Sequence, residues 1–142
     1  LALRNDGTVV AWGDDRAGQA SVPLGLTGVT AIAAGQGHSL AEMDDGTVVA
    51  WGDDRAGQAS VPAGLTGVTA IAAGYAHSLA LRNDGTVVAW GDDRHGQASV
   101  PLGLTGVTAI AAGQGHSLAA MDDGTVVAWG DDRAGQATVP EG

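Results

Sequence analysis

Histidine and paired aspartate are the residues in this chain whose types could do chemistry, and both recur at a fixed spacing. Histidines occupy positions 38, 77 and 116, and aspartate pairs occupy positions 14–15, 53–54, 92–93 and 131–132. Histidine is the commonest metal ligand in proteins. Two carboxylates in different environments can form an acid–base pair when they face one cleft.

The spacing of these residues argues against a metal centre and against catalysis. Histidines one repeat apart cannot converge on one ion, so we predict that each bonds neighbouring backbone and fixes a turn. Adjacent aspartates share one loop and lack the alternating ligands of a calcium loop, so we predict that they cap turns and pair with arginine, as Asp15 with Arg16. Because no nucleophile–base set or cofactor fingerprint is present, we expect no enzyme activity, no catalytic residue, no metal site and no cofactor.

A repeat of 39 residues positions these groups. Tryptophans keep the same step at 12, 51, 90 and 129, and the copies run 1–39, 40–78, 79–117 and, in part, 118–142. An aromatic residue at the same place in every copy is predicted to fill the space between repeats. A ring of aromatic side chains that forms a binding surface is the alternative. Copies this similar indicate recent duplication or an engineered repeat protein.

The pattern of turn residues and short apolar runs within one copy is typical of β-structure. Residues 30–35 form a short apolar run, residues 77–82 alternate in polarity, and residues 86–91 are rich in β-branched side chains. The Asn-Asp-Gly sequence at 83–85 predicts a tight hairpin turn. A short fourth strand is expected near Pro101, at a sheet edge because proline cannot donate to a ladder. The chain is therefore predicted to be all-β, a β-propeller built from 39-residue blades of three to four antiparallel strands, with a solenoid of hairpins as the rival.

Three segments of the repeat carry a resemblance to a known family. The runs IAAGYAHSLAL (71–81), DGTVVAWG (84–91) and GQ (96–97) resemble the regulator of chromosome condensation repeat, and the likeness covers essentially the whole chain. Members of that family form propellers, usually of seven blades. Two positions depart from the pattern, since Glu42 and Ala120 stand where it has a large aliphatic residue.

The number of residues predicts how the chain divides into blades and how identical chains assemble. We predict one propeller unit over 1–142, with an incomplete first blade at 1–25 and further blades at 26–64, 65–103 and 104–142. Open blade faces favour closure, and a pair of identical chains is the simplest way to close a ring. A homodimer of about eight blades is therefore expected. The first residue is Leu1, so we expect that the chain is not a complete translation product.

Composition limits the classes of partner. The 142 residues carry a formal net charge of −10, with six arginines, no lysine and no cysteine. Phosphate binding needs clustered cations, so we expect no nucleic acid and no membrane surface as partner. A cationic or neutral partner is favoured instead. No apolar run approaches the roughly 18 residues of a membrane span.

The positions at which the copies differ point to one face. If the first strand of a blade runs upward, its following turn and the Gly-Asp-Asp-Arg loop after the third strand share the upper face. The differences there are Ala17/His95, Gln36/Tyr75 and Gly37/Ala76. Loops on a rigid scaffold commonly bind partners, so the candidate binding residues are Tyr75, His95, Gln36 and Gln114. Drift at an exposed position explains His95 equally well.

These observations favour a non-enzymatic propeller that serves as a scaffold or protein-interaction module. The family resemblance also includes a bacterial propeller that inhibits β-lactamase, so an inhibitor that binds an enzyme such as a β-lactamase through one ring face is the alternative. Nucleotide exchange on a small GTPase is a third interpretation, disfavoured because 39-residue blades leave no room for a protruding wedge. The sequence leaves the cellular compartment open.

Overall fold

The computed structural model describes residues 1–141, and its regular elements are all β-strands. The strands are β1 (Ala2–Leu3), β2 (Val9–Val10), β3 (Val29–Ala34), β4 (His38–Met43), β5 (Val48–Gly52), β6 (Val68–Ala73), β7 (His77–Arg82), β8 (Val87–Gly91), β9 (Val107–Ala112), β10 (His116–Met121) and β11 (Val126–Gly130). They form three antiparallel sheets of three strands and one of two. Within residues 1–141 there is no helix that could cross a membrane.

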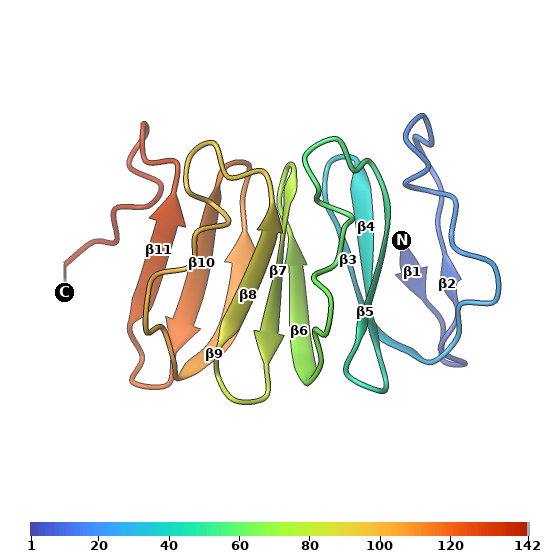
Figure 1. The fold of residues 1–142 in the computed structure, drawn as a ribbon, viewed down its shortest axis with the longest axis horizontal. Helices are drawn as coiled ribbons and strands as arrows, with labels where there is room; N and C mark the ends of the chain where they lie inside the picture. Colours follow the sequence, from blue (N-terminus) through green and yellow to red (C-terminus); the bar gives the residue numbers. More distant parts are fainter. Residues whose placement is uncertain (142) are drawn as a thin grey trace.

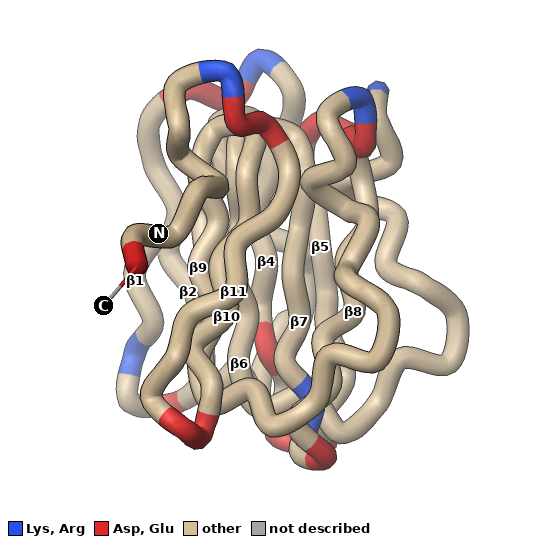
Figure 2. Tube along the Cα trace, turned by 90° about the vertical axis from the view of Figure 1, so that its left-hand side faces the viewer, with Lys and Arg blue, Asp and Glu red and all other residues tan. Residues whose placement is uncertain are grey.

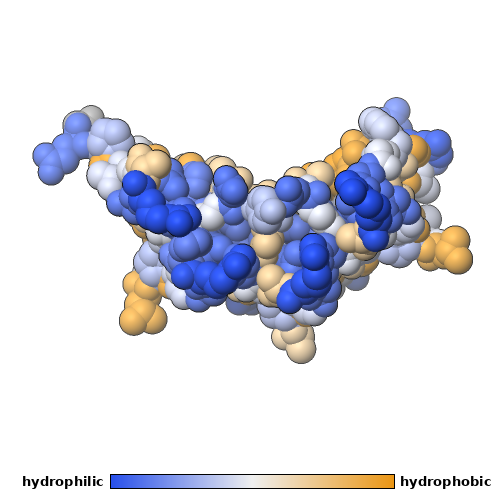
Figure 3. Space-filling view, turned by 90° about the horizontal axis from the view of Figure 1, so that it is seen from above, coloured by the Kyte–Doolittle hydropathy of each residue, from blue (hydrophilic) through white to orange (hydrophobic). Residues whose placement is uncertain are grey.

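Each three-stranded sheet is one blade of a β-propeller, which confirms the predicted fold class. The sheets are β3-β4-β5, β6-β7-β8 and β9-β10-β11, and β1 pairs with β2. Figure 1 shows them side by side, with the two chain ends at opposite ends of the row. Seen from above, the row bends into an open arc (Figure 3). We keep 1–25, 26–64, 65–103 and 104–142 as our proposed division into blades.

The core lies between neighbouring sheets. The first strands of successive sheets contact one another, β3 with β6 and β6 with β9, and each first strand also contacts the second strand of the preceding sheet. One core cluster contains Leu40 from β4, Val68 from β6 and Trp90 from β8. Small side chains, among them Ala50 and Ala73, pack against this cluster, which lets neighbouring sheets pack closely.

The predicted hairpin at residues 83–85 is confirmed. Gly85 adopts φ +79°, which glycine tolerates and other residues rarely do, and its N–H donates to Arg82 O at 3.0 Å. Thr86 N–H bonds Asp84 Oδ1 at 3.0 Å. The turn also holds the next blade, because Val107 N–H donates to Gly85 O at 3.1 Å.

The predicted fourth strand is absent from residues 98–101, which form a loop. Asp93 explains the difference, because its Oδ1 accepts the N–H of Ala98 at 2.8 Å and its Oδ2 accepts the hydroxyl of Ser99 at 2.6 Å. Ser99 N–H is taken by Gly96 O at 3.1 Å, and Pro101 has no N–H. The backbone N–H groups of Ala98 and Ser99 are therefore used locally.

Candidate functional site

The recurring histidines join neighbouring blades. His38 Nε2 lies 2.9 Å from Ser78 Oγ in the next sheet, and Ser78 Oγ donates to Gln58 O at 2.9 Å. Because the serine hydroxyl has one hydrogen and gives it to the carbonyl, His38 Nε2 must be the donor of the first bond. The predicted backbone partner of the histidine was wrong. Its partner is a serine side chain one blade away.

Burial keeps His38 and His77 neutral near pH 7. His38 and His77 are at most 1 % exposed, and burial lowers the pKa of His77 to about 4. With the hydrogen on Nε2, Nδ1 is an acceptor, and in both residues this acceptor is buried without a hydrogen-bond partner. No group of three metal-binding side chains occurs within residues 1–141.

Three of the four tryptophans fill space between blades, as predicted. Trp51, Trp90 and Trp129 are 7–8 % exposed. Each indole N–H also bonds the backbone carbonyl of a glutamine from the preceding blade, at 2.9 Å for Trp90 and Gln58. Trp12, which follows the last strand of the two-stranded sheet, is 68 % exposed. We call the histidine, serine, tryptophan and glutamine set between two sheets a blade junction.

The second group of polar residues lies in the four upper loops, residues 13–19, 52–58, 91–97 and 130–136. In the second of these, Asp53 Oδ1 accepts Arg55 Nε at 2.8 Å and Asp53 Oδ2 accepts Arg55 Nη2 at 2.6 Å. Asp54 caps the loop, accepting Ala59 N–H at 2.8 Å and the Ser60 hydroxyl at 2.6 Å. The paired aspartate is thus two residues before the arginine, and not adjacent to it as predicted. The adjacent aspartate is the capping residue.

The upper loops place the arginines outside and the paired carboxylates inside. The arginine side chains are 75–90 % exposed, whereas the side chains of Asp53, Asp92 and Asp131 are 10–13 % exposed. Hydrogen bonds from Arg55 lower the pKa of Asp53 to about 2, so the carboxylate stays ionised near neutral pH. Figure 2 shows arginine and aspartate together in these loops and mainly acidic residues at the opposite end of the sheets.

The turns that follow the first strands lie beside the upper loops, as expected. Asp53 N–H donates to Gly37 O at 2.7 Å, and Asp92 N–H donates to Ala76 O at 2.9 Å. Together the upper loops and the turns at 35–37, 74–76 and 113–115 form what we call the upper face. The hairpin turns at 4–7, 43–46, 82–85 and 121–124 form the lower face.

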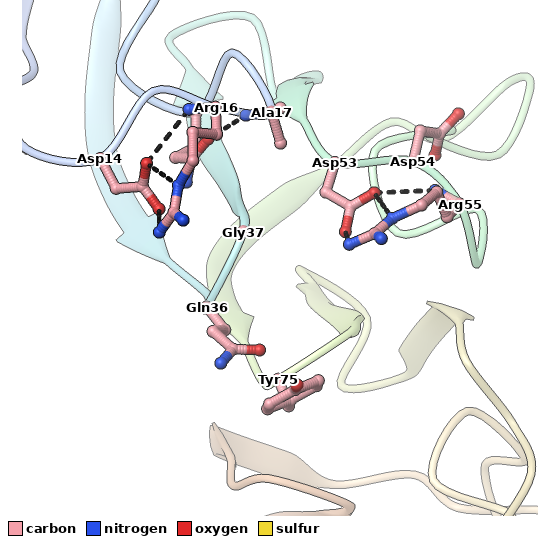
Figure 4. A pocket seen from close by; sticks show the side chains of 11 residues that line it. Asp14, Arg16, Ala17, Gln36, Gly37, Asp53, Asp54, Arg55 and Tyr75 are labelled. Atoms are coloured by element: carbon pink, nitrogen blue, oxygen red, sulfur yellow. Dashed lines mark hydrogen bonds and ion pairs between the residues drawn. The ribbon is translucent and has the colours of Figure 1, made fainter.

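The four predicted binding residues line two grooves on the upper face. Gln36 and Tyr75 border a groove of about 700 Å³ with Arg16 and Arg55, and Figure 4 shows Gln36 and Tyr75 near each other, below the two loops that carry these arginines. Tyr75 also lines a second groove of about 450 Å³, together with His95 and Gln114. The Tyr75 side chain is 44 % exposed. The structure therefore brings Tyr75 together with Gln36 in one groove and with His95 and Gln114 in the other.

His95 extends toward the next blade. A Cβ atom built on Gly115 would lie 3.7 Å from His95 Cδ2. Hydrogen bonds from Arg133, and to a smaller extent the proximity of His95, lower the pKa of Asp131. The sequence did not single out the arginines of the upper loops as binding residues. The signal was present in the arginine that follows every aspartate pair.

Comparison with known sequences places this repeat in a family. The profile described as the regulator of chromosome condensation (RCC1) repeat matches residues 29–58, 68–97 and 107–136. These segments make up more than half of the chain. The chain belongs to the RCC1 repeat family. No curated protein sequence matches it.

Solved structures show the same fold in RCC1 proteins. Yeast RCC1 (Prp20), solved with Kap60, matches with a TM-score of 0.80 and 24% identity, over 92% of this chain and 41% of that one. Prp20p from Saccharomyces cerevisiae, studied for binding to Gsp1p and histones, matches with a TM-score of 0.73 and 22% identity, over 84% and 40%. The ectodomain of the Arabidopsis thaliana receptor kinase ACR4 matches with a TM-score of 0.69 and 24% identity, over 90% and 45%. The chain thus spans less than half the length of each.

Proposed function

We propose that this chain is a non-enzymatic protein-interaction module that binds its partner through the upper face. The observation that carries the proposal is the position of Tyr75. Copies one and three differ only at 17/95, yet copy two replaces Gln36 by Tyr75 at the point where the upper grooves meet. A tyrosine that is 44 % exposed on a rigid turn is well suited to anchor a protein partner.

Two further observations support this class of function. The carboxylates of the upper loops are bonded to arginine, backbone N–H or hydroxyl groups of their own loop, so they are poorly placed to act as general bases. Yeast Prp20 has been solved in complex with the protein Kap60. Inhibition of a β-lactamase, the alternative, would require an aromatic-rich face, and Tyr75 is the one Phe, Tyr or Trp residue in the three grooves that it lines.

The proposal is tested by comparing one residue on each face. A photo-reactive amino acid at position 75 or at position 45 would identify the partner by cross-linking, and the affinity for the purified partner would then be measured by titration. Tyr75→Ala should weaken binding about 30-fold, because truncating an interface anchor costs about 2 kcal/mol. Asp45→Ala, on the lower face, should change it less than twofold. Equal losses would remove the assignment to the upper face.

We propose further that the 142-residue chain, prepared by itself, forms a homodimer that closes a ring of about eight blades. Its two end surfaces carry different halves of a blade junction. Trp12 is 68 % exposed at one end, and His116 at the other has no serine hydroxyl bonded to it within residues 1–141. Native mass spectrometry should show twice the chain mass of 13.9 kDa. A well-folded monomer at micromolar concentration would refute this assembly.

A further inference from the structure

Each upper arginine has one bidentate edge in use and one available. A guanidinium group has five N–H donors in a planar fork. Asp53 takes the edge formed by Nε and Nη2 of Arg55, and Asp92 takes the same edge of Arg94. The Nη1 atoms of both arginines make no hydrogen bond within residues 1–141. The edge formed by Nη1 and Nη2 is therefore left for a second carboxylate.

Asp53 and Asp92 hold the guanidinium groups and thereby fix the direction of the free Nη1–Nη2 edge. The Arg55 and Arg94 side chains are 88% and 76% exposed, and their partner carboxylates are 13% and 10% exposed. An exposed arginine normally loses rotamer entropy when it binds. Here the bidentate contact with aspartate already holds the guanidinium in place, so less entropy remains to be lost on binding an incoming group.

Two of these arginines border the same groove with Tyr75. Arg55, Tyr75 and Arg94 line a groove of about 430 Å³ between neighbouring upper loops. The Tyr75 hydroxyl has no partner within residues 1–141, and its ring supplies apolar contact area. The groove therefore offers a ligand an aromatic surface between two sets of hydrogen-bond donors.

The two faces differ in how far their carboxylates are already occupied by hydrogen bonds. The upper loops hold eight aspartates and four arginines, and the lower face holds six aspartates and two arginines. On the upper face the aspartates already accept hydrogen bonds from their own loops, as Asp53 and Asp54 do. On the lower face Asp44 and Asp122 accept no side-chain hydrogen bond within residues 1–141. The upper face therefore has unused hydrogen-bond donors on its arginines, and the lower face has unused acceptors on its aspartates.

We propose that the groove between Arg55 and Arg94 binds an acidic segment of a partner protein, with Asp or Glu carboxylates on the free arginine edges and an apolar part of the segment on Tyr75. This inference names the chemistry of the partner and rests on the proposed function. The net charge of the chain opposes it at long range. At about 0.15 M salt the screening length is about 8 Å, so contacts within the groove decide binding.

The test uses three matched peptides and NMR titration of the isotope-labelled chain at 0.15 M salt. The probe is acetyl-Glu-Ala-Glu-Ala-Glu-amide, and its controls carry Gln or Lys in place of Glu. The Glu peptide should shift the Nε–H signals of Arg55 and Arg94 and the amide signal of Tyr75. The Gln peptide should leave them in place. Groove binding by the Lys peptide, or no binding by the Glu peptide, would overturn the proposal.

Substitutions then separate the groove from general charge. Arg94→Gln should weaken binding of the Glu peptide about fivefold or more, as expected for the loss of a charge-assisted bidentate contact. Arg94→Lys should recover part of this loss at most, because lysine lacks the fork. Arg82→Gln removes the same charge from the lower face and should have no effect. Equal weakening by Arg94→Gln and Arg82→Gln would show a nonspecific charge effect and overturn the proposal.

The outcome is separable from that of the proposed function. If Tyr75→Ala abolishes partner binding while the Glu peptide fails to bind, the upper face is the interaction surface and the acidic chemistry is wrong. If the Glu peptide binds at Arg55 and Arg94 but the cross-linked partner is held by position 45, the groove has the proposed chemistry and the function assigned to the face is wrong.

Discussion

The blade junctions and the upper loops use polar side chains in opposite ways. At a junction, buried side chains bond across two sheets, as Ser78 does with His38 and with Gln58 O. In an upper loop, side chains bond within a few residues, as Asp53 does with the exposed Arg55. The junction residues are the same in every complete copy, whereas the upper face contains the differences at 36/75 and 17/95. One 39-residue unit thus separates the contacts that hold the blades together from the surface that is free to change.

The strongest test of this contrast is a methyl group added against a junction histidine, at Gly74, and one added in an upper loop, at Gly57. A Cβ atom on Gly74 would overlap the His77 ring and lie 2.5 Å from Gly113 O, whereas one on Gly57 meets nothing within 4 Å. Gly74→Ala should cost about 3 kcal/mol or more of unfolding free energy, through overpacking. Gly57→Ala should cost about 1 kcal/mol, from its φ of +81° alone. Urea denaturation gives both values, and similar costs would contradict the contrast.

Serine provides the next comparison. Ser78→Ala removes the acceptor of His38 Nε2 and leaves a buried N–H without a partner, so it should cost about 2 kcal/mol. Ser60→Ala removes an exposed hydroxyl that bonds Asp54, and it should cost about 0.5 kcal/mol. Chemical denaturation of the two variants checks the ranking. If Ser60→Ala proved the more damaging, the loops and not the junctions would be the stabilising element.

Acid should act on the junctions before it acts on the loops. Burial lowers the pKa of His77 to about 4 and lowers that of His38, both below the unfolded value of about 6.5. The unfolded chain therefore binds more protons, and stability should fall as the pH decreases from about 6.5 toward 4. Asp53, with a pKa of about 2, stays ionised over this range.

This pH dependence is measured by urea denaturation between pH 7.5 and 5. Asp53, Asp54 and Asp92 lie near the two histidines and oppose part of the effect, and the raised pKa of Glu42 also acts in the opposite direction. His77→Gln should be less stable than the parent at pH 7.5 but should lose less stability on acidification. An unchanged pH slope in this variant would contradict the role of the buried histidine.

The smallest expected effect is on the stability of the upper loops themselves. Arg55 is 88% exposed, and exposed ion pairs contribute little to folding. Arg55→Gln should therefore change the unfolding free energy by less than about 0.5 kcal/mol. A loss comparable to that of Ser78→Ala would show that the loops are structural, and the proposed division of labour would fail.

Much of the fold could be predicted because the same local sequence signals recur in each copy of the repeat. Glycine turns, the strands at 77–82 and 86–91 and the hairpin at 83–85 are local signals that each copy repeats. The His38–Ser78 bond could not be predicted, because it joins residues 40 positions apart in different copies. The predicted fourth strand does not form because Asp93 takes the Ala98 N–H and Gly96 O takes the Ser99 N–H within the loop.

The upper face could be located from the sequence, but its chemistry could not. Alternating strand direction was enough to place Tyr75 near His95. The spacing of Asp53 and Arg55 did not show which aspartate would pair with the arginine, since that depends on the conformation of the loop. The free Nη1–Nη2 edge of Arg55 can be identified only when it is known that Asp53 takes the other edge.

Hydrogen–deuterium exchange of the chain with and without its cross-linked partner tests the central claim most directly. Binding should slow exchange at the upper-face amides of residues 52–58, 74–76 and 91–97 and leave the lower turns at 43–46 and 82–85 unchanged. The amide of Tyr75, whose N–H donates to Gly113 O at 3.3 Å, should show the largest protection. Protection confined to the lower turns, or to the two end sheets, would contradict the upper face as the binding surface.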